Sequence, residues 1–123
     1  MKHPERAFHF TAEVKDGTRA EKIVGYAGFW LIGDEVNIVN IAVHPDYRRR
    51  GIAGKLWRRM MSEALQKKVK IATLEVRAAN TPAKTFYEHQ GFKLIAIRKG
   101  YYADNGEDAH VMWLNPLQLE ETA

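Results

Sequence analysis

The segment between residues 48 and 54 has the residue types and spacing of a turn that could bind phosphate groups. It reads Arg48, Arg49, Arg50, Gly51, Ile52, Ala53, Gly54. An amphipathic helical pattern begins at Gly51, and a helix N-terminus presents unpaired N–H groups and the positive end of the helix dipole. Small residues let phosphates approach these groups closely, and arginines add positive charge. The turn therefore predicts a pyrophosphate-binding site; a basic turn that simply precedes a helix is the alternative.

Other phosphate-binding patterns do not fit this turn. No Gly-Lys-Ser/Thr follows it, as a Walker A loop requires, and the Gly-x-Gly-x-x-Gly spacing of a Rossmann fingerprint is absent. Nucleic acid is another polyanion that the arginines and the net charge of +4 would suit. No aromatic stripe is interleaved with the basic residues, so direct nucleic-acid binding is not expected.

Hydrophobic periodicity predicts the elements that must position the turn. Apolar alternation and apolar runs indicate strands at residues 7–14, 23–32, 36–43, 70–77, 92–102 and 110–114. Apolar residues four apart predict an amphipathic helix from Gly51 onward. A second helix is expected from Thr81, the predicted cap, to Gly91, with Pro82 at the first helical position. Asp-Gly and Asp-Asn-Gly sequences predict turns at 15–18 and 104–106.

This order of elements predicts an α/β (α+β) fold with a mixed, mostly antiparallel central sheet and helices packed on it. The strand–helix–strand unit over residues 36–77 is a crossover, so its two strands are expected to be parallel neighbours. A length of 123 residues fits one domain, residues 1–123.

Composition excludes several kinds of chemistry. The chain has no cysteine, which excludes disulfides, thiolate metal sites and a cysteine nucleophile. The histidines lack metal-ligand spacing, so no metal is predicted. Residues 1–13 lack the apolar run of a signal peptide, and no stretch has the length of a membrane span. These features predict a cytoplasmic protein that does not enter a membrane.

The turn and several further motifs resemble those of the GNAT N-acetyltransferases. Arg48-x-x-Gly51-x-Ala53 is similar to the family's acetyl-CoA signature, Gln/Arg-x-x-Gly-x-Gly/Ala. Other segments resemble the branch that acetylates ribosomal-protein N-terminal alanine, namely residues 40–45, 74–80, 86–88, 91–92, 98–102 and 107–109. They follow in the family's order from about Phe8 to Leu114. The resemblance implies the acyl-CoA N-acyltransferase fold and acetyl transfer from acetyl-CoA to an amine.

The resemblance also implies which residues contact acetyl-CoA. In the family, the pantetheine arm lies in a gap between the third strand and its parallel neighbour, and backbone amides hold the pyrophosphate. The matching positions are Ile41, Ala42, Val43, Arg48, Arg49, Arg50, Gly51, Ile52, Ala53, Gly54 and Asn80. From the residues alone, the favoured interpretation of Asn80 is a loop residue before the Thr81 cap.

Two residues match the family's catalytic positions: Glu75 as general base and Tyr87 as general acid. A carboxylate in a strand beneath helices is expected to be partly buried, which raises its pKa and suits it to base work. The alternative for Glu75 is a carboxylate that forms a salt bridge, with Arg77 as the partner. The alternative for Tyr87 is a core aromatic, although Phe86 fits that packing role better.

The sequence specifies the acceptor of the acetyl group less closely than it specifies the cofactor. Arg98, Tyr101 and Tyr102 resemble the segment that contacts the acceptor peptide, or form an ordinary strand end. His44 and His89 are alternative bases, or surface and cap residues. The favoured acceptor is the N-terminal alanine of a ribosomal protein. Lysine or a small amine, an acetyl-CoA-binding module without turnover, and a basic RNA- or ribosome-binding domain are the alternatives.

The N-terminus departs from the family pattern. Members usually begin with a strand and two helices before the strand expected here at residues 7–14. Their absence would leave apolar surface open, which favours a homo-oligomer and makes acceptor specificity harder to predict than cofactor binding.

Overall fold

The structure is a computed structural model that describes residues 6–15 and 21–117. Its strands are β1 (Arg6–Lys15), β2 (Glu21–Ile32), β3 (Glu35–Val43), β4 (Ile71–Arg77), β5 (Lys93–Arg98) and β6 (Ala109–Leu114). Its helices are α1 (Ile52–Gln66), α2 (Thr81–His89) and the short 3₁₀ helix η1 (Pro45–Tyr47). The predicted order of strands and helices is confirmed, whereas the turn expected at 15–18 falls mostly outside the described residues.

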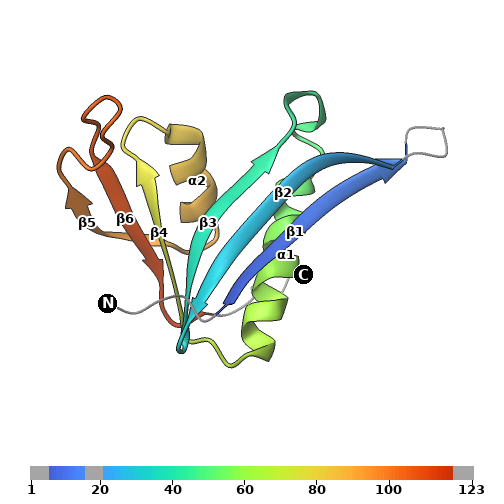
Figure 1. The fold of residues 1–123 in the computed structure, drawn as a ribbon, viewed down its shortest axis with the longest axis horizontal. Helices are drawn as coiled ribbons and strands as arrows, with labels where there is room; N and C mark the ends of the chain where they lie inside the picture. Colours follow the sequence, from blue (N-terminus) through green and yellow to red (C-terminus); the bar gives the residue numbers. More distant parts are fainter. Residues whose placement is uncertain (1–5, 16–20, 118–123) are drawn as a thin grey trace.

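The six strands form one sheet in the order β1-β2-β3-β4-β6-β5 (Figure 1). Among the described strands, only β3 and β4 run parallel, as the crossover predicted. Their pairing covers three residue pairs, from Glu35–Ile71 to Asn37–Thr73. Beyond that point the two strands diverge, which Figure 1 shows as a V between the green and yellow strands. The sheet is therefore continuous at one end and split into two halves at the other.

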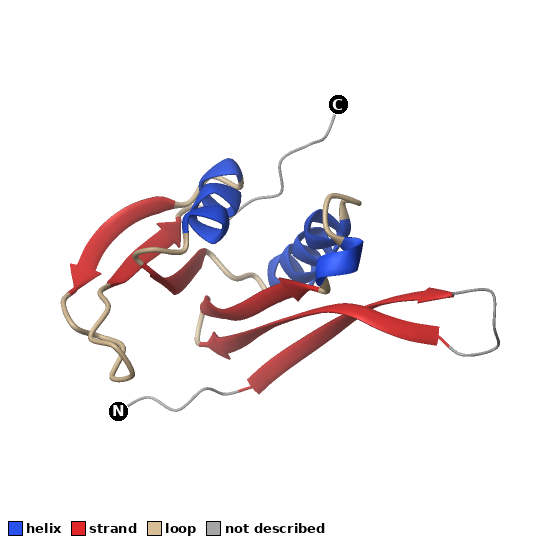
Figure 2. Ribbon diagram, turned by 90° about the horizontal axis from the view of Figure 1, so that it is seen from above, coloured by secondary structure: helices blue, strands red, loops and turns tan. Residues whose placement is uncertain are grey.

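Both long helices lie on the same face of the sheet (Figure 2). Leu56, Trp57, Met60 and Met61 of α1 are buried. The Trp57 ring links the helices, since its centroid lies 6.4 Å from that of Tyr87 in α2 and 5.5 Å from that of Phe92. The prediction that helices pack on the sheet is thus confirmed for one face, and the described residues place no helix on the other.

A close approach of backbones positions the first turn of α1. Gly25 in β2 lies beneath this turn, and a Cβ atom there would be 3.0 Å from the Ala42 carbonyl oxygen and 3.2 Å from Leu56 Cδ1. Only a residue without a side chain leaves this space free. As a result the N-terminus of α1 lies against the end of β3, next to the split in the sheet.

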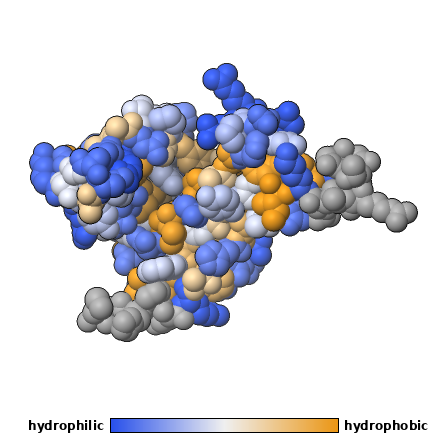
Figure 3. Space-filling view, turned by 45° about the horizontal axis from the view of Figure 1, so that its top comes forward, coloured by the Kyte–Doolittle hydropathy of each residue, from blue (hydrophilic) through white to orange (hydrophobic). Residues whose placement is uncertain are grey.

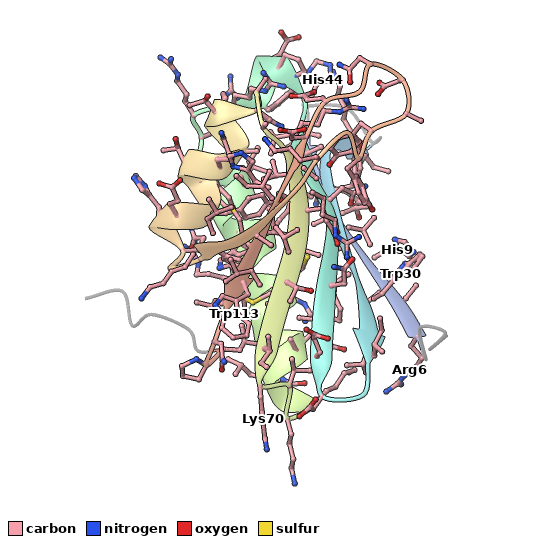
Figure 4. All side chains as sticks on the ribbon, turned by 90° about the vertical axis from the view of Figure 1, so that its left-hand side faces the viewer. Arg6, His9, Trp30, His44, Lys70 and Trp113 are labelled. Atoms are coloured by element: carbon pink, nitrogen blue, oxygen red, sulfur yellow. The ribbon has the colours of Figure 1, made fainter. Side chains whose placement is uncertain are left out.

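The face without helices carries exposed aromatic side chains. Tyr26 and Trp30 of β2 are 51% and 41% exposed, and Val39 of β3 is also exposed. Figure 4 shows Trp30 and His9 projecting away from the helices. Figure 3 looks obliquely onto this face and shows apolar residues among the polar ones. Self-association through this surface stays a prediction.

The strand predicted at residues 92–102 is shorter than expected. The sequence pattern indicated residues 92–102, but β5 ends at Arg98. Gly100 has a φ of 60°, a left-handed conformation that an extended strand does not accept. Residues 99–108 instead form a loop, which Figure 2 shows extending to the side opposite the helices. No helix in the described residues is both long and apolar enough to cross a membrane.

Candidate functional site

A cavity of about 590 Å³ opens where the two halves of the sheet separate. Its wall consists of the end of β3, the turn before α1, the first turn of α1 and one side of α2: Ile41, Ala42, Val43, Tyr47, Arg48, Arg49, Gly51, Ile52, Ala53, Gly54, Asn80, Pro82, Ala83, Phe86 and Tyr87. This volume lies within the range of roughly 300–1,000 Å³ typical of ligand sites. Segments that are distant in sequence thus converge on one hollow.

A second hollow of similar volume lies between β1 and α1, lined by residues such as Phe10, Leu56 and Arg59. Its walls include Ile52 at the start of α1 but none of the turn residues from Arg48 to Gly51. The first cavity combines apolar walls with converging backbone N–H groups and a tyrosine hydroxyl, the combination expected of a ligand site. We therefore consider the cavity at the split to be the candidate site.

The turn before α1 has the geometry of an anion-binding site. Gly51 is the N-cap of α1, has a φ of 75°, and no side chain caps the helix. The first main-chain bond into the helix is donated by Lys55 N to Gly51 O, so the N–H groups of Ile52, Ala53 and Gly54 precede the helical pattern. Arg49 is also left-handed, with a φ of 64°. Successive N–H groups in such a turn form a concave site for anions.

The three arginines of the turn have different environments. Arg48 lines the cavity and its Nε donates to the carbonyl oxygen of Val43 at 3.4 Å. Arg49 also lines it. Arg50 does not, and its guanidinium lies over the Tyr47 ring, 4.9 Å from the centroid. Arg50 is the single member of the predicted cofactor set that lies outside the cavity wall, and the left-handed turn at Arg49 separates it from its neighbours.

Asn80 has a structural role as well as a place in the cavity wall. It is the N-cap of α2, and its Oδ1 accepts a hydrogen bond from Ala83 N at 3.3 Å. The prediction that Thr81 caps this helix is therefore wrong, because Thr81 already lies in the first turn. Capping occupies the side-chain oxygen of Asn80 and leaves its amide NH₂ group to donate toward the cavity.

Tyr87 is packed in the core and also lines the cavity. It is 7% exposed and is the buried residue of α2, whereas Phe86 is only partly buried. The packing role assigned by sequence to Phe86 therefore belongs at least as much to Tyr87. Burial raises the pKa of the Tyr87 phenol to about 12. The hydroxyl consequently keeps its proton at neutral pH, as a proton donor must.

This pKa predicts a distinct tyrosine titration. We expect one phenol of the folded protein to ionise near pH 12, well above the usual value of 10. Since the unfolded chain releases this proton first, the contribution of Tyr87 to folding stability is fully present below pH 10 and decreases between pH 10 and about 12. Tyrosinate absorbance measured against pH, with and without Tyr87→Phe, checks this. Unchanged high-pH absorbance in the variant would contradict it.

Glu75 lies on the face of the sheet opposite the helices. Its neighbours Leu74 and Val76 face the core, so strand alternation turns Glu75 outward, and it is partly exposed. The expectation that helices cover it is therefore wrong. It does not line the cavity. No ion pair or hydrogen bond of its side chain occurs within the described ranges, so the alternative of a salt bridge to Arg77 is also wrong in this structure.

The predicted acceptor segment lies at the edge of this same face. Arg98 has its guanidinium 5.5 Å from the Tyr101 ring centroid. Tyr102 is close enough to Glu75 that the carboxylate helps to raise the pKa of its phenol, although burial is the larger cause. The sequence did not predict that Tyr47, Pro82, Ala83 and Phe86 line the cavity, and it assigned no role to the acidic residues of the 99–108 loop.

The histidines considered as alternative bases are at the surface. His44 caps η1, with its Nδ1 accepting from Asp46 N at 3.1 Å, and His89 is exposed at the end of α2. Figure 4 shows His44 at one extremity of the molecule. In the part of the chain that the structure describes, no group of three potential metal ligands occurs.

Gly54 offers a direct test of the cavity. A Cβ atom there would meet no protein atom closer than Arg58 Nη1, at 3.6 Å, so a methyl group fits the fold but enters the wall of the cavity. For Gly54→Ala we expect folding stability to be unchanged or to rise, by up to about 1 kcal/mol, because alanine favours helices. Acetyl-CoA binding should weaken by about tenfold or more.

Thermal unfolding and calorimetric titration with acetyl-CoA measure the two effects of Gly54→Ala. Gln66→Ala, at the other end of α1, is the matched control and should leave binding unchanged. Wild-type affinity in the Gly54→Ala variant would place the phosphate groups elsewhere.

Comparison with known proteins adds independent information. The model of the "Acetyltransferase (GNAT) family" matches residues 1–92. The chain is 39% identical over 106 residues to a putative [ribosomal protein bS18]-alanine N-acetyltransferase of Bacillus subtilis, covering 86% of this chain and 68% of that protein. It is 38% identical over 104 residues to the [ribosomal protein bS18]-alanine N-acetyltransferase of Escherichia coli K12, covering 83% and 70%.

The fold is similar to that of a solved structure. The crystal structure of the ribosomal-protein-S18-alanine N-acetyltransferase from Escherichia coli superposes with a TM-score of 0.78 at 34% sequence identity. The similarity covers 98% of this chain and 76% of that one. The predicted fold is thereby confirmed.

Proposed function

Because the chain belongs to the acetyltransferase (GNAT) family and uses acetyl-CoA as the acetyl donor, we propose that it acetylates the N-terminal amine of a protein. The favoured acceptor is the N-terminal alanine of ribosomal protein bS18, the substrate named for relatives at 38–39% identity. The observation that carries the proposal is the cavity at the split, where an uncapped helix N-terminus, Asn80 and Tyr87 converge.

The residues that line the cavity support the proposal that acetyl-CoA binds there. The N–H groups from Arg49 to Gly54 and the charge of Arg48 suit its pyrophosphate. Residues 41–43 pair with β2 on one side only, because the pairing of β3 with β4 ends at Asn37. Their other edge can therefore pair with the amide groups of the pantetheine arm. The Asn80 amide is placed to donate to a carbonyl group of the same arm.

The split in the sheet supports a division of the reaction between two faces. Tyr87 lies on the helix side, at the cavity, and Glu75 lies on the opposite side. We propose that the acceptor amine approaches from the side of Glu75. The amine nitrogen attacks the thioester carbonyl and the carbon–sulfur bond breaks. Glu75 accepts the proton that the amine loses, directly or through a water, and the Tyr87 hydroxyl donates to the departing sulfur.

A peptide assay tests this function. A peptide beginning with alanine is incubated with acetyl-CoA and the protein, and released thiol is measured while mass spectrometry locates the acetyl group. We expect modification at the N-terminal amine and none on the same peptide with a blocked N-terminus. Acetyl groups on lysine would favour the side-chain alternative. Calorimetric binding of acetyl-CoA without thiol release above background would favour a binding module without turnover.

A further inference from the structure

Arg77 is the centre of a polar cluster on the face of the sheet that carries Glu75. It is the last residue of β4, two positions after Glu75, and strand alternation puts both side chains on the same face. Its Nη2 lies 2.9 Å from Asp104 Oδ2 and its Nη1 lies 3.2 Å from Glu107 Oε1. The guanidinium also lies over the Tyr102 ring, 4.0 Å from the centroid. A single side chain thus contacts the 99–108 loop at several points.

The cluster extends to the segment between β4 and α2. The second oxygen of Glu107, Oε2, accepts a hydrogen bond from Ala79 N at 2.8 Å. The Ala78 N–H donates to the Asp108 carbonyl oxygen at 3.0 Å. Since Ala79 directly precedes Asn80, the loop is bound to the segment that carries one wall of the acetyl-CoA cavity. The contacts of Arg77 therefore join the loop on one face to the split in the sheet.

The same contacts explain why no ion-pair partner of Glu75 occurs among the residues that the structure describes. Arg77 is the nearest cation along its strand, and it is engaged by Asp104 and Glu107 instead. A guanidinium paired directly with Glu75 would occupy the carboxylate oxygens and stabilise their charge, which would weaken Glu75 as a base. The acidic residues of the loop therefore keep the arginine away from the carboxylate proposed to accept the proton.

We propose that Arg77 is a positioning residue that holds the 99–108 loop beside Glu75, so that the loop forms one wall of the acceptor site while Glu75 stays unpaired. This inference rests on the proposed function. The planar guanidinium is required, because its two terminal nitrogens pair with two different carboxylates while its flat face stacks on Tyr102. A lysine ammonium supplies the charge but has neither the second nitrogen nor the flat stacking surface.

The inference is tested with Arg77→Met and Arg77→Lys in the full chain. We expect Arg77→Met to raise KM for the acceptor peptide by about tenfold or more, the loss typical of a charge-assisted contact. The dissociation constant of acetyl-CoA should stay within about twofold. Arg77→Lys should recover only part of the loss. Arg59→Met is the matched control, since Arg59 also pairs with a carboxylate, Glu63, and lies over the Phe10 ring, but far from the split.

A second measurement separates positioning from a general effect on folding. Asp104 is exposed, so Asp104→Asn should alter the loop without unfolding the protein. Because Asp104 acts through Arg77, the double variant Arg77→Met/Asp104→Asn should be little worse than Arg77→Met alone. The proposal would be overturned if the effects of the two substitutions on KM for the peptide were additive. It would also be overturned if KM for the peptide and the dissociation constant of acetyl-CoA rose equally.

Hydrogen exchange distinguishes failure of this inference from failure of the proposed function. The amides of Gly100, Tyr102 and Gly106 donate hydrogen bonds within the loop. We expect them to exchange faster in Arg77→Met, whether or not a peptide is turned over. If the wild-type protein is inactive but these amides still exchange faster in Arg77→Met, the proposed acceptor is rejected, and the role of Arg77 in holding the loop is retained. Unchanged exchange in the variant would reject the anchor itself.

Discussion

Tyr87→Phe is expected to lower kcat by about 10² to 10⁴-fold, the range for loss of a general acid. The phenylalanine ring preserves the contacts with Trp57 and Phe92, whose centroids lie 6.4 and 5.6 Å away. The variant should therefore fold as the wild type does. Its affinity for acetyl-CoA should also change little, because the anion-binding turn is untouched. Steady-state thiol release, thermal unfolding and calorimetric titration measure the three quantities.

Tyr26→Phe is a suitable control for that experiment. It removes a hydroxyl from an exposed tyrosine on the opposite face and should leave kcat at the wild-type value. If Tyr87→Phe also keeps the wild-type kcat, the buried hydroxyl has no part in the reaction, and Tyr87 is only a packed aromatic. A loss of folding stability without a change in kcat would lead to the same conclusion.

Glu75→Gln is expected to lower kcat by about 10²-fold or more, because the amide has the shape of the carboxylate but cannot accept the amine's proton at neutral pH. Since Glu75 does not line the acetyl-CoA cavity, the dissociation constant of acetyl-CoA should stay unchanged. Rapid-mixing measurements at saturating acetyl-CoA would report the chemical step, and calorimetry would report binding.

Glu88→Gln provides the matched control, since Glu88 is an exposed carboxylate on α2. A Glu75→Gln protein as active as the wild type would exclude Glu75 as the base. The effect of His44→Ala would then decide whether the other sequence candidate takes that role. Weakened acetyl-CoA binding in Glu75→Gln would instead show that the carboxylate lies closer to the donor site than the proposed division between faces allows.

Local sequence signals predicted a helix, strand or turn correctly wherever its physical cause lies within one short segment. The apolar stripe of α1 and the alternation in β1 and β4 arise from the periods of helices and strands, so these elements were predicted within about two residues. The turn from Arg48 to Gly54 is likewise one continuous segment. Its small residues and charges predict an anion-binding site without knowledge of the rest of the fold.

The sequence-based predictions were wrong where the position or partner of a side chain depends on residues distant in the sequence. Asn80 and Thr81 are both good helix caps, and the folded chain uses Asn80. Alternation put Glu75 and Leu74 on opposite faces but could not tell which face the helices cover. The engagement of Arg77 by Asp104 and Glu107 depends on contacts between residues 27 and 30 positions apart, which no local pattern encodes.

By itself, the sequence determined the elements, their order, the anion-binding turn and the resemblance that identifies acetyl-CoA as the donor. All of these depend on short segments, whose periodicity and composition carry the physical information. Only the tertiary structure decided that both helices share one face, that β3 and β4 separate after three residue pairs, and that Tyr87 and Glu75 lie on opposite sides of the sheet. These features result from packing between segments distant in sequence, where burial of apolar surface selects one arrangement.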